Sequence, residues 1–208
     1  MMSDIYRQFS EDCLLVASHN DGKVKEIAAL LKPLKISIMS SKQLGLPEPI
    51  EDGKTFIDNA VLKARSACEN SKLPSLADDS GLAVSALAGR PGIFSARWAE
   101  TATGRNFQKA IYKVHREMGQ SEDRSAEFIC ALALCWPDGH IECFQGKICG
   151  TIVWPPRGTT GFGYDPIFQA IGDNVTFSEI DPIEKQKKSH RAIAFNKMVD
   201  ACFNLPDG

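Results

Sequence analysis

The sequence lacks an excess of either charge, and this absence narrows the partners that the protein can have. Its 208 residues carry 24 lysine and arginine against 26 aspartate and glutamate side chains, a formal net charge of -2. Proteins that bind double-stranded nucleic acid neutralise many phosphates and are normally basic. We therefore expect no nucleic acid as the main partner, although a local basic cluster can still hold a few phosphates.

The sequence also lacks a long apolar run. No stretch approaches the roughly 18 uncharged apolar residues that a membrane-spanning helix needs. Residues 1–12 carry Asp4, Arg7, Glu11 and Asp12 where a signal peptide would have its apolar segment. We expect a cytoplasmic protein that does not bind a membrane.

A Cys-x-x-Cys motif is missing as well. The seven cysteines are odd in number, and most of them stand inside apolar runs. This pattern favours reduced core residues in a cytosolic protein over a disulfide framework or a zinc site.

Hydrophobic residues make up 43% of the chain and charged residues 24%, as in an ordinary globular protein. Helical periodicity predicts helices after residue 22, from 55, over 106–118 and from about 189. Thr55 and Asp58 form a capping-box pattern at the second of these. Apolar runs predict strands over 13–17, 35–39, 75–77, 82–87, 128–136 and 140–153. The last two should pair as an antiparallel hairpin, with 128–136 central because it is apolar on both faces. Helices and strands alternate in the first part of the chain, and an antiparallel hairpin comes later. This order indicates an α/β protein with a mixed sheet. No segment is a convincing boundary that would divide residues 1–208 into separate domains.

Two strand ends carry candidate chemistry. Residues 18–23 connect a strand to a helix N-terminus and include Lys23, an arrangement that suits an anion. Taken alone, this segment is better explained as an ordinary connection with an exposed lysine. Asp78 and Asp79 follow the apolar residues Leu76 and Ala77. An Asp-rich turn is the ordinary explanation, but acids directly after a buried strand lie at the carboxyl edge of the sheet, where ligands bind in α/β folds. Only one of the two should face a given site, because adjacent strand residues point to opposite faces.

Paired acids at such an edge suit Mg2+, which prefers oxygen ligands. Glu48, Glu51 and Asp52 precede the Thr55 helix and are candidates for a second ligand, although solvated loop charge is the better explanation of this segment taken alone. Asn59 and Lys63 share one face of that helix. This face points either into a site or into water.

Two later segments complete the candidates. Residues 158–166 are glycine-rich, and Phe162 and Tyr164 offer flat faces for a base. The alternative is a glycine-rich hairpin loop with packed aromatics. Residues 184–191 hold three lysines and an arginine beside an expected helix N-terminus, where cations are disfavoured unless an anion binds nearby.

Taken together, these segments resemble the inosine triphosphate pyrophosphatase family, which removes dITP, ITP and XTP from the nucleotide pool. The resemblance runs from about Leu14 to the C-terminal helix. It rests on five segments in order: ASHNDGKVKEI, DGKTFIDNAVLKA, LADDSGLAV with PGIFSARW, TGFGYDPIF and SHR. His19 stands where the family usually has glycine, and Thr160-Gly161 replaces the usual Gly-Gly.

The resemblance assigns a role to each matching residue. Glu51 and Asp79 are implied as ligands of Mg2+, and Asp79, directly or through the metal, as the base that activates water for attack at the α-phosphorus. The residues implied to bind substrate are Ser18, His19, Asn20, Asp21, Gly22, Lys23, Lys63, Ser80, Phe162, Gly163, Tyr164, Asp165, Lys185, His190 and Arg191. Of these, Lys23, Lys63 and Lys185 are suited to balancing phosphate charge.

The resemblance also implies a fold and a reaction. The fold is an elongated mixed β-sheet flanked by helices, in one domain of two lobes with a central substrate cleft, usually a homodimer. The reaction converts non-standard purine nucleoside triphosphates to monophosphate and pyrophosphate. Two alternatives stay open, a related pyrophosphatase acting on other modified or standard nucleotides and a nucleotide-binding module without turnover.

Overall fold

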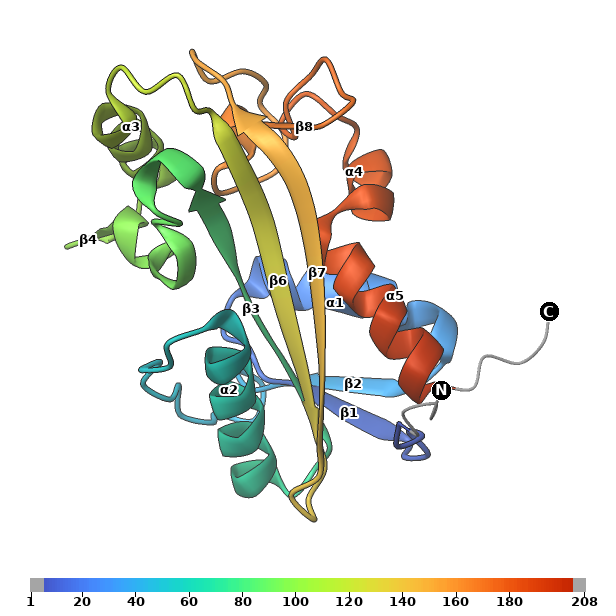
Figure 1. Cartoon of the computed structure of the whole chain (residues 1–208). Helices are drawn as coiled ribbons and strands as arrows, with labels where there is room; N and C mark the ends of the chain where they lie inside the picture. Colours follow the sequence, from blue (N-terminus) through green and yellow to red (C-terminus); the bar gives the residue numbers. More distant parts are fainter. Residues whose placement is uncertain (1–5, 204–208) are drawn as a thin grey trace. The chain divides into compact units, whose positions relative to one another are not determined.

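The computed structural model describes residues 6–203, except for the side chains of Asp21 and Gln186. Its main sheet has six strands in the order β2-β1-β3-β6-β7-β8 (Figure 1). The strands of this sheet are β1 (Cys13–Val16), β2 (Ser37–Ser40), β3 (Ser75–Val84), β6 (Ser125–Cys135), β7 (Ile141–Ile152) and β8 (Phe168–Ala170). β1 is parallel to both β2 and β3, whereas β8 is antiparallel to β7. The predicted mixed sheet and α/β class are therefore confirmed.

The chain divides into two compact units. Unit 1 comprises residues 6–79, 131–145 and 193–203, and unit 2 comprises residues 80–130 and 146–192. β3, β6 and β7 each contribute residues to both units. The helices are α1 (Asp21–Leu31), α2 (Phe56–Ser71), α3 (Phe107–Met118), α4 (Pro182–Lys188) and α5 (His190–Cys202).

Unit 1 holds the parallel strands. Leu14, Leu15 and Val16 of β1 are fully buried, as expected for a parallel strand whose two faces are both covered. β1 and β2 lie side by side in Figure 1, and α1 connects them. The capping box predicted for α2 is confirmed: Thr55 Oγ1 accepts from Asp58 N, and the Asp58 carboxylate accepts from Thr55 N.

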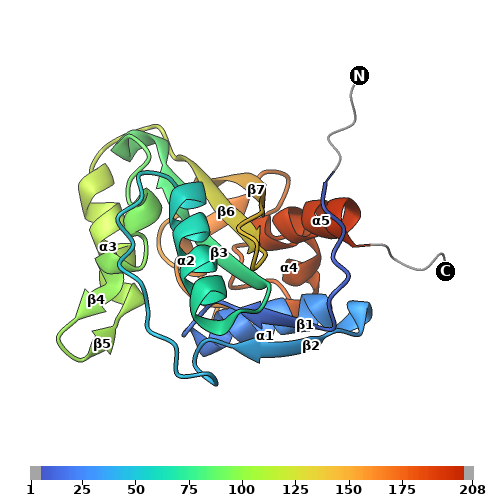
Figure 2. The same cartoon turned by 90° about the horizontal axis from the view of Figure 1, so that it is seen from below.

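Unit 2 has a core of its own. The stripe predicted for α3 is buried at Ala110, Ile111, Val114 and Met118. Figures 1 and 2 both place α3 beside the segment that forms the small two-stranded sheet of β4 (Glu100–Thr101) and β5 (Gly104–Arg105). This core forms one cluster with the aromatic rings of the later strands and loops.

The interpretation of Asp78 and Asp79 as a turn is wrong. β3 continues without interruption from Ser75 to Val84, so both aspartates lie in the middle of a strand. The extended segment predicted over 82–87 is right only to Val84, because Ser85–Leu87 forms a 3-10 turn. Position 81 of β3 requires glycine, because a Cβ there would collide with Ser95 and with the Gly92 carbonyl. The backbone at Gly92 approaches the strand closely at this point.

The basic cluster also lies elsewhere than predicted. Lys185, Lys187 and Lys188 occupy the last turn of α4, a helix that the sequence analysis missed. Cations at a helix C-terminus interact favourably with the helix dipole, so the cluster no longer requires a bound anion. The predicted C-terminal helix exists as α5 and begins at His190.

The cysteines are only partly as expected. All seven are free, and Cys68, Cys130, Cys135 and Cys202 are buried. Cys143 and Cys149 are exposed, because they occupy outward-facing positions of β7. Across residues 6–203, no helix has both the length and the apolar character to cross a membrane.

The capping box generates a stability prediction. Thr55→Ala removes the hydroxyl that accepts from Asp58 N, and we expect the free energy of unfolding to fall by about 1 kcal/mol. Thr55→Ser is the matched control, because serine retains this acceptor. Urea denaturation measures both variants, and equal stability of Thr55→Ala and wild type would contradict the assigned cap.

Candidate functional site

The turn before α1 is organised by Asn20. The Asn20 side chain accepts from Gly22 N at 3.0 Å and from Lys23 N at 3.3 Å, while Ser18 Oγ accepts from Asn20 N. Two amides of the first helical turn are therefore already bonded within the loop. The ring of His19 is hydrogen-bonded to the Leu46 carbonyl at 2.8 Å, which ties the turn to the loop after β2.

Lys23 lies beside one of the paired aspartates. Its Nζ is 2.9 Å from Asp78 Oδ2, and the Asp78 side chain is almost completely buried. A buried carboxylate without a cation would cost several kcal/mol, so Lys23 is not the exposed lysine of an ordinary connection. Asp78 is the buttressing member of the pair, as the alternation along a strand predicts.

Lys63 lies between the two carboxylates that the resemblance implies as metal ligands. Its Nζ is 2.6 Å from Glu51 Oε1 and 3.2 Å from Asp79 Oδ1. The Lys63 side chain is 11% exposed and that of Asp79 is 9% exposed, so water screens this pair weakly. These distances bring Glu51, Lys63 and Asp79 together in unit 1.

Burial and neighbouring charges raise the pKa values of both Asp79 and Lys63. Desolvation raises the pKa of Asp79, and the nearby charges of Lys63 and Lys23 oppose the shift without cancelling it. Burial alone would lower the pKa of Lys63, but the carboxylates of Asp79, Asp78 and Glu51 outweigh burial and raise it. Lys63 is therefore strongly held as an ammonium ion.

Asn59 belongs to the same cluster, although the sequence analysis gave it no role. Its side chain is completely buried, donates from Nδ2 to Asp79 Oδ2 at 3.2 Å and accepts from Gly53 N at 2.9 Å. α2 thus presents an amide and an ammonium one turn apart, each in contact with a different oxygen of Asp79. The i, i+4 spacing of Asn59 and Lys63 was the signal in the sequence.

The residues present fit one hard divalent cation. Two carboxylates that reach a single ammonium nitrogen are also near enough to approach one metal ion together. Within residues 6–203, no group of three or more His, Cys, Asp or Glu side chains is arranged to hold a metal. A two-carboxylate site matches Mg2+, which usually keeps several waters and takes further oxygens from substrate phosphates.

Unit 2 contains a second buried ion pair. Lys185 Nζ is 2.5 Å from Asp165 Oδ2, and that oxygen also accepts from Phe162 N at 2.8 Å. The ammonium lies 5.1 Å from the centre of the Phe162 ring. Desolvation raises the pKa of Asp165, and Lys185 opposes the shift. Gly161 is required here, because a Cβ at its φ of 75° would collide with Asp165 Oδ2.

The two aromatic residues of this loop differ in exposure. Phe162 is 47% exposed, so its ring has a free face that a base can stack on. Tyr164 is 3% exposed, packs edge-on against Phe107 and donates to the Ser95 carbonyl at 2.8 Å. The expectation that Tyr164 offers a flat face is wrong, because its ring is part of the core.

The start of α5 brings together further candidates of unit 2. Arg191 is 2% exposed, and its Nη2 donates to Ser80 Oγ at 3.0 Å. The His190 ring stacks on Phe128 with a centroid distance of 4.9 Å. Both side chains are held rigidly by their neighbours, which suits the recognition of one ligand orientation.

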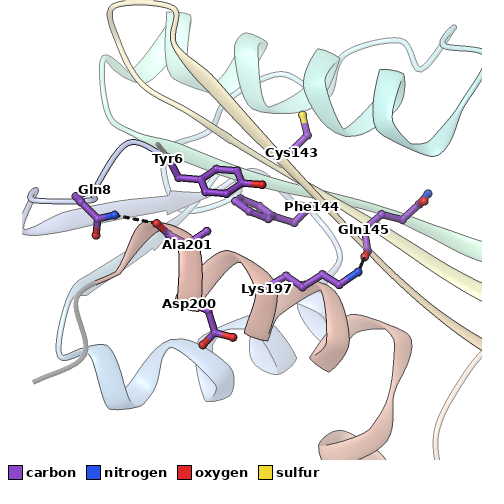
Figure 3. Close-up of a pocket in the computed structure, with 8 residues that line it drawn as sticks. All are labelled: Tyr6, Gln8, Cys143, Phe144, Gln145, Lys197, Asp200 and Ala201. Atoms are coloured by element: carbon purple, nitrogen blue, oxygen red, sulfur yellow. Dashed lines mark hydrogen bonds between the residues drawn. The ribbon is translucent and has the colours of Figure 1, made fainter. Parts of the chain in front are cut away.

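A pocket of about 800 Å³ lies in another part of unit 1 (Figure 3). It is bordered by the segment around Tyr6, by β7 at Phe144 and by α5 at Lys197. Lys197 Nζ donates to the Gln145 carbonyl, and Gln8 Nε2 donates to the Ala201 carbonyl. None of the predicted site residues lines this pocket, so it is separate from the candidate site.

A comparison with protein families matches residues 14–201 to the Ham1 family. The chain is 49% identical over 203 residues to a dITP/XTP pyrophosphatase of Zymomonas mobilis, with 96% of each protein covered. It is 52% identical over 200 residues to a dITP/XTP pyrophosphatase of Rhodospirillum centenum, covering 95% of this chain and 98% of the relative.

Solved structures agree with this match. The Staphylococcus aureus Ham1 protein superposes with a TM-score of 0.81 at 33% identity, covering 89% of this chain and 95% of the other. A HAM1 protein from Coxiella burnetii superposes with a TM-score of 0.80 at 37% identity, covering 91% and 98%.

The buried pair of unit 2 generates a prediction with an internal control. Asp165→Asn leaves Lys185 buried without its carboxylate, and we expect the free energy of unfolding to fall by about 3 kcal/mol. The control is Glu184→Gln, which breaks the exposed pair of Glu184 and Lys187 at the similar distance of 2.6 Å. Its expected effect is below about 0.5 kcal/mol.

Urea denaturation of both variants checks this difference between a buried and an exposed ion pair. Equal losses of stability would show that burial of Asp165 does not determine the strength of its pair.

Proposed function

The chain belongs to the Ham1 family, and from this membership we propose that it hydrolyses non-standard purine nucleoside triphosphates. The substrates are dITP, ITP and XTP, and the products are the nucleoside monophosphate and pyrophosphate. The names of two relatives that share about half of their residues with this chain, over nearly its whole length, support this proposal. The observation in the chain itself that carries it is the cluster of Glu51, Lys63 and Asp79.

We propose Mg2+ as the metal, held by Glu51 and Asp79. When bound, it would neutralise phosphate charge and help to activate water. Lys23 and Lys63 bind the phosphates in this proposal, because each carries its charge next to the paired aspartates of β3. Asn59 orients the Asp79 carboxylate through its hydrogen bond to Oδ2.

Asp79 accepts a proton from the attacking water, which adds to the α-phosphorus and displaces pyrophosphate. Burial and the hydrogen bond from Asn59 hold its carboxylate in one orientation, which favours a positioned general base. Most of the remaining catalysis is positioning and charge stabilisation, as in other phosphoryl transfers.

Later segments of the chain are proposed to recognise the base. Phe162 stacks on the purine, whereas Arg191 and His190 donate hydrogen bonds to a 6-oxo group. Four further residues support these contacts in the proposal. Lys185 pairs with Asp165, Ser80 accepts a hydrogen bond from Arg191, and Gly163 contributes its backbone.

A homodimer in the cytoplasm is a further proposal. The seven free cysteines support a reducing compartment. Light scattering on the purified protein measures the oligomeric state, and a monomer at micromolar concentration would contradict the dimer.

The proposed base predicts that Asp79→Asn binds nucleotide but scarcely turns over. The substitution preserves size and removes the charge that holds metal and accepts a proton, so the rate should fall by roughly 10²–10⁴ or more. Pyrophosphate release at saturating Mg2+ measures the rate, with thermal unfolding as the check on the fold. Near wild-type turnover would refute this role of Asp79.

The same assay separates the alternatives. A panel of dITP, ITP, XTP and the standard nucleotides distinguishes this activity from that of a related pyrophosphatase. A protein that binds dITP without releasing pyrophosphate would be a nucleotide-binding module. Glu51 and Asp79 argue against the last case, because a binding module needs no acid to activate water.

Base recognition generates a second prediction. Arg191 can only donate hydrogen bonds, so it fits the 6-oxo acceptor of hypoxanthine and is left unpaired by the amino group of adenine. We expect Arg191→Ala to lower the ratio of kcat/KM for dITP to that for dATP by at least about tenfold.

Phe162→Ala is the comparison for Arg191→Ala. Stacking does not read the 6-position, so this substitution should lower kcat/KM for both nucleotides by a similar factor. An unchanged dITP/dATP ratio in Arg191→Ala would remove Arg191 from base recognition.

A further inference from the structure

Lys63 occupies the position where the proposed function requires a metal ion. Its ammonium is within 2.6 Å of Glu51 and 3.2 Å of Asp79, the same two carboxylates that are proposed as metal ligands. A cation therefore lies between these two acids. A lysine ammonium and a divalent cation would repel each other strongly at such short distances, particularly where the surroundings are largely buried.

We propose that Lys63 is a placeholder for the divalent cation and makes metal binding depend on the nucleotide. In the free protein its ammonium compensates Glu51 and Asp79 and competes with metal. When the triphosphate arrives, the ammonium of Lys63 transfers from the carboxylates to phosphate oxygens, which would leave Glu51 and Asp79 available to hold the metal. This inference rests on the proposed function and concerns the order in which metal and nucleotide bind.

The chemistry of lysine suits this exchange. Its flexible four-carbon stem and three rotatable N–H donors allow it to change acceptors without moving the helix. Asn59 holds Asp79 Oδ2 independently of Lys63, so the carboxylate stays oriented when Lys63 leaves Oδ1. The buried acids therefore have a cation next to them both before and after nucleotide binding.

Lys23 provides a matched control. It also pairs with a buried aspartate of β3, at 2.9 Å, and carries the same charge in the same unit. Its partner is Asp78, which is not a proposed metal ligand. Removing Lys23 therefore tests the effect of a lost positive charge, whereas removing Lys63 also empties the position between Glu51 and Asp79.

The test measures Mn2+ affinity by calorimetry in the absence of nucleotide. We expect Lys63→Met to bind Mn2+ about tenfold more tightly than wild type or better. Lys63→Arg retains the charge and should bind as weakly as wild type, and Lys23→Met should change the affinity by less than about threefold. If Lys63→Met binds Mn2+ no more tightly than Lys23→Met, Lys63 is not a placeholder.

A measurement on wild type covers the case in which Lys63→Met does not fold. Acetic anhydride labels lysines, and peptide mass spectrometry reports the extent at each position. Saturating Mn2+ should increase labelling of Lys63, because the displaced ammonium leaves its carboxylates, and should leave Lys23 unchanged. Unchanged labelling of Lys63 in the metal-bound protein would overturn the inference.

The inference and the proposed function fail in distinguishable ways. If wild type releases pyrophosphate from dITP but Lys63→Met does not gain Mn2+ affinity, only the placeholder role is wrong. If wild type releases no pyrophosphate, the proposed function is wrong, and the metal titration still decides whether Lys63 competes with a cation.

Discussion

Two adjacent aspartates in the middle of β3 impose the main constraint on unit 1. Both are buried, and a buried carboxylate is tolerable only beside a cation or several hydrogen-bond donors. Since neighbouring residues of a strand point to opposite faces, each aspartate has a different lysine in direct contact. Lys23 from α1 therefore compensates Asp78, and Lys63 from α2 compensates Asp79.

Much of the fold could be predicted from local patterns. The apolar run of β1, the capping box at Thr55 and the stripe of α3 each identify their element without tertiary information. The prediction failed at Asp78 and Asp79, because acids followed by serine and glycine are typical of turns. Ion pairs from distant helices allow the strand to continue, and a local pattern does not contain these pairs. α4 was missed because its seven residues are too few for a clear period.

The candidate site was harder to predict, since single segments had ordinary explanations. Lys23 alone could be an exposed surface lysine. Only the order of five motifs along the chain favours the interpretation that it binds phosphate. Burial separates residues that motifs treat alike: Phe162 is exposed and Tyr164 is in the core, although they are two positions apart. The sequence leaves Asn59 between a site and water, because its hydrogen bonds are to Gly53 in a loop and to Asp79 in a distant strand.

The ion pairs of the candidate lysines also affect the free energy of ligand binding. Each of the three candidate phosphate-binding lysines already contacts a carboxylate, so phosphate would share or replace an existing partner instead of meeting an uncompensated charge. The existing ion pair then reduces the gain on binding, while it also compensates the buried carboxylate. In unit 1 a metal can take over the carboxylates that a lysine leaves. In unit 2 Asp165 keeps the Phe162 amide as a partner, so this loop remains anchored by a hydrogen bond even when its lysine turns toward substrate.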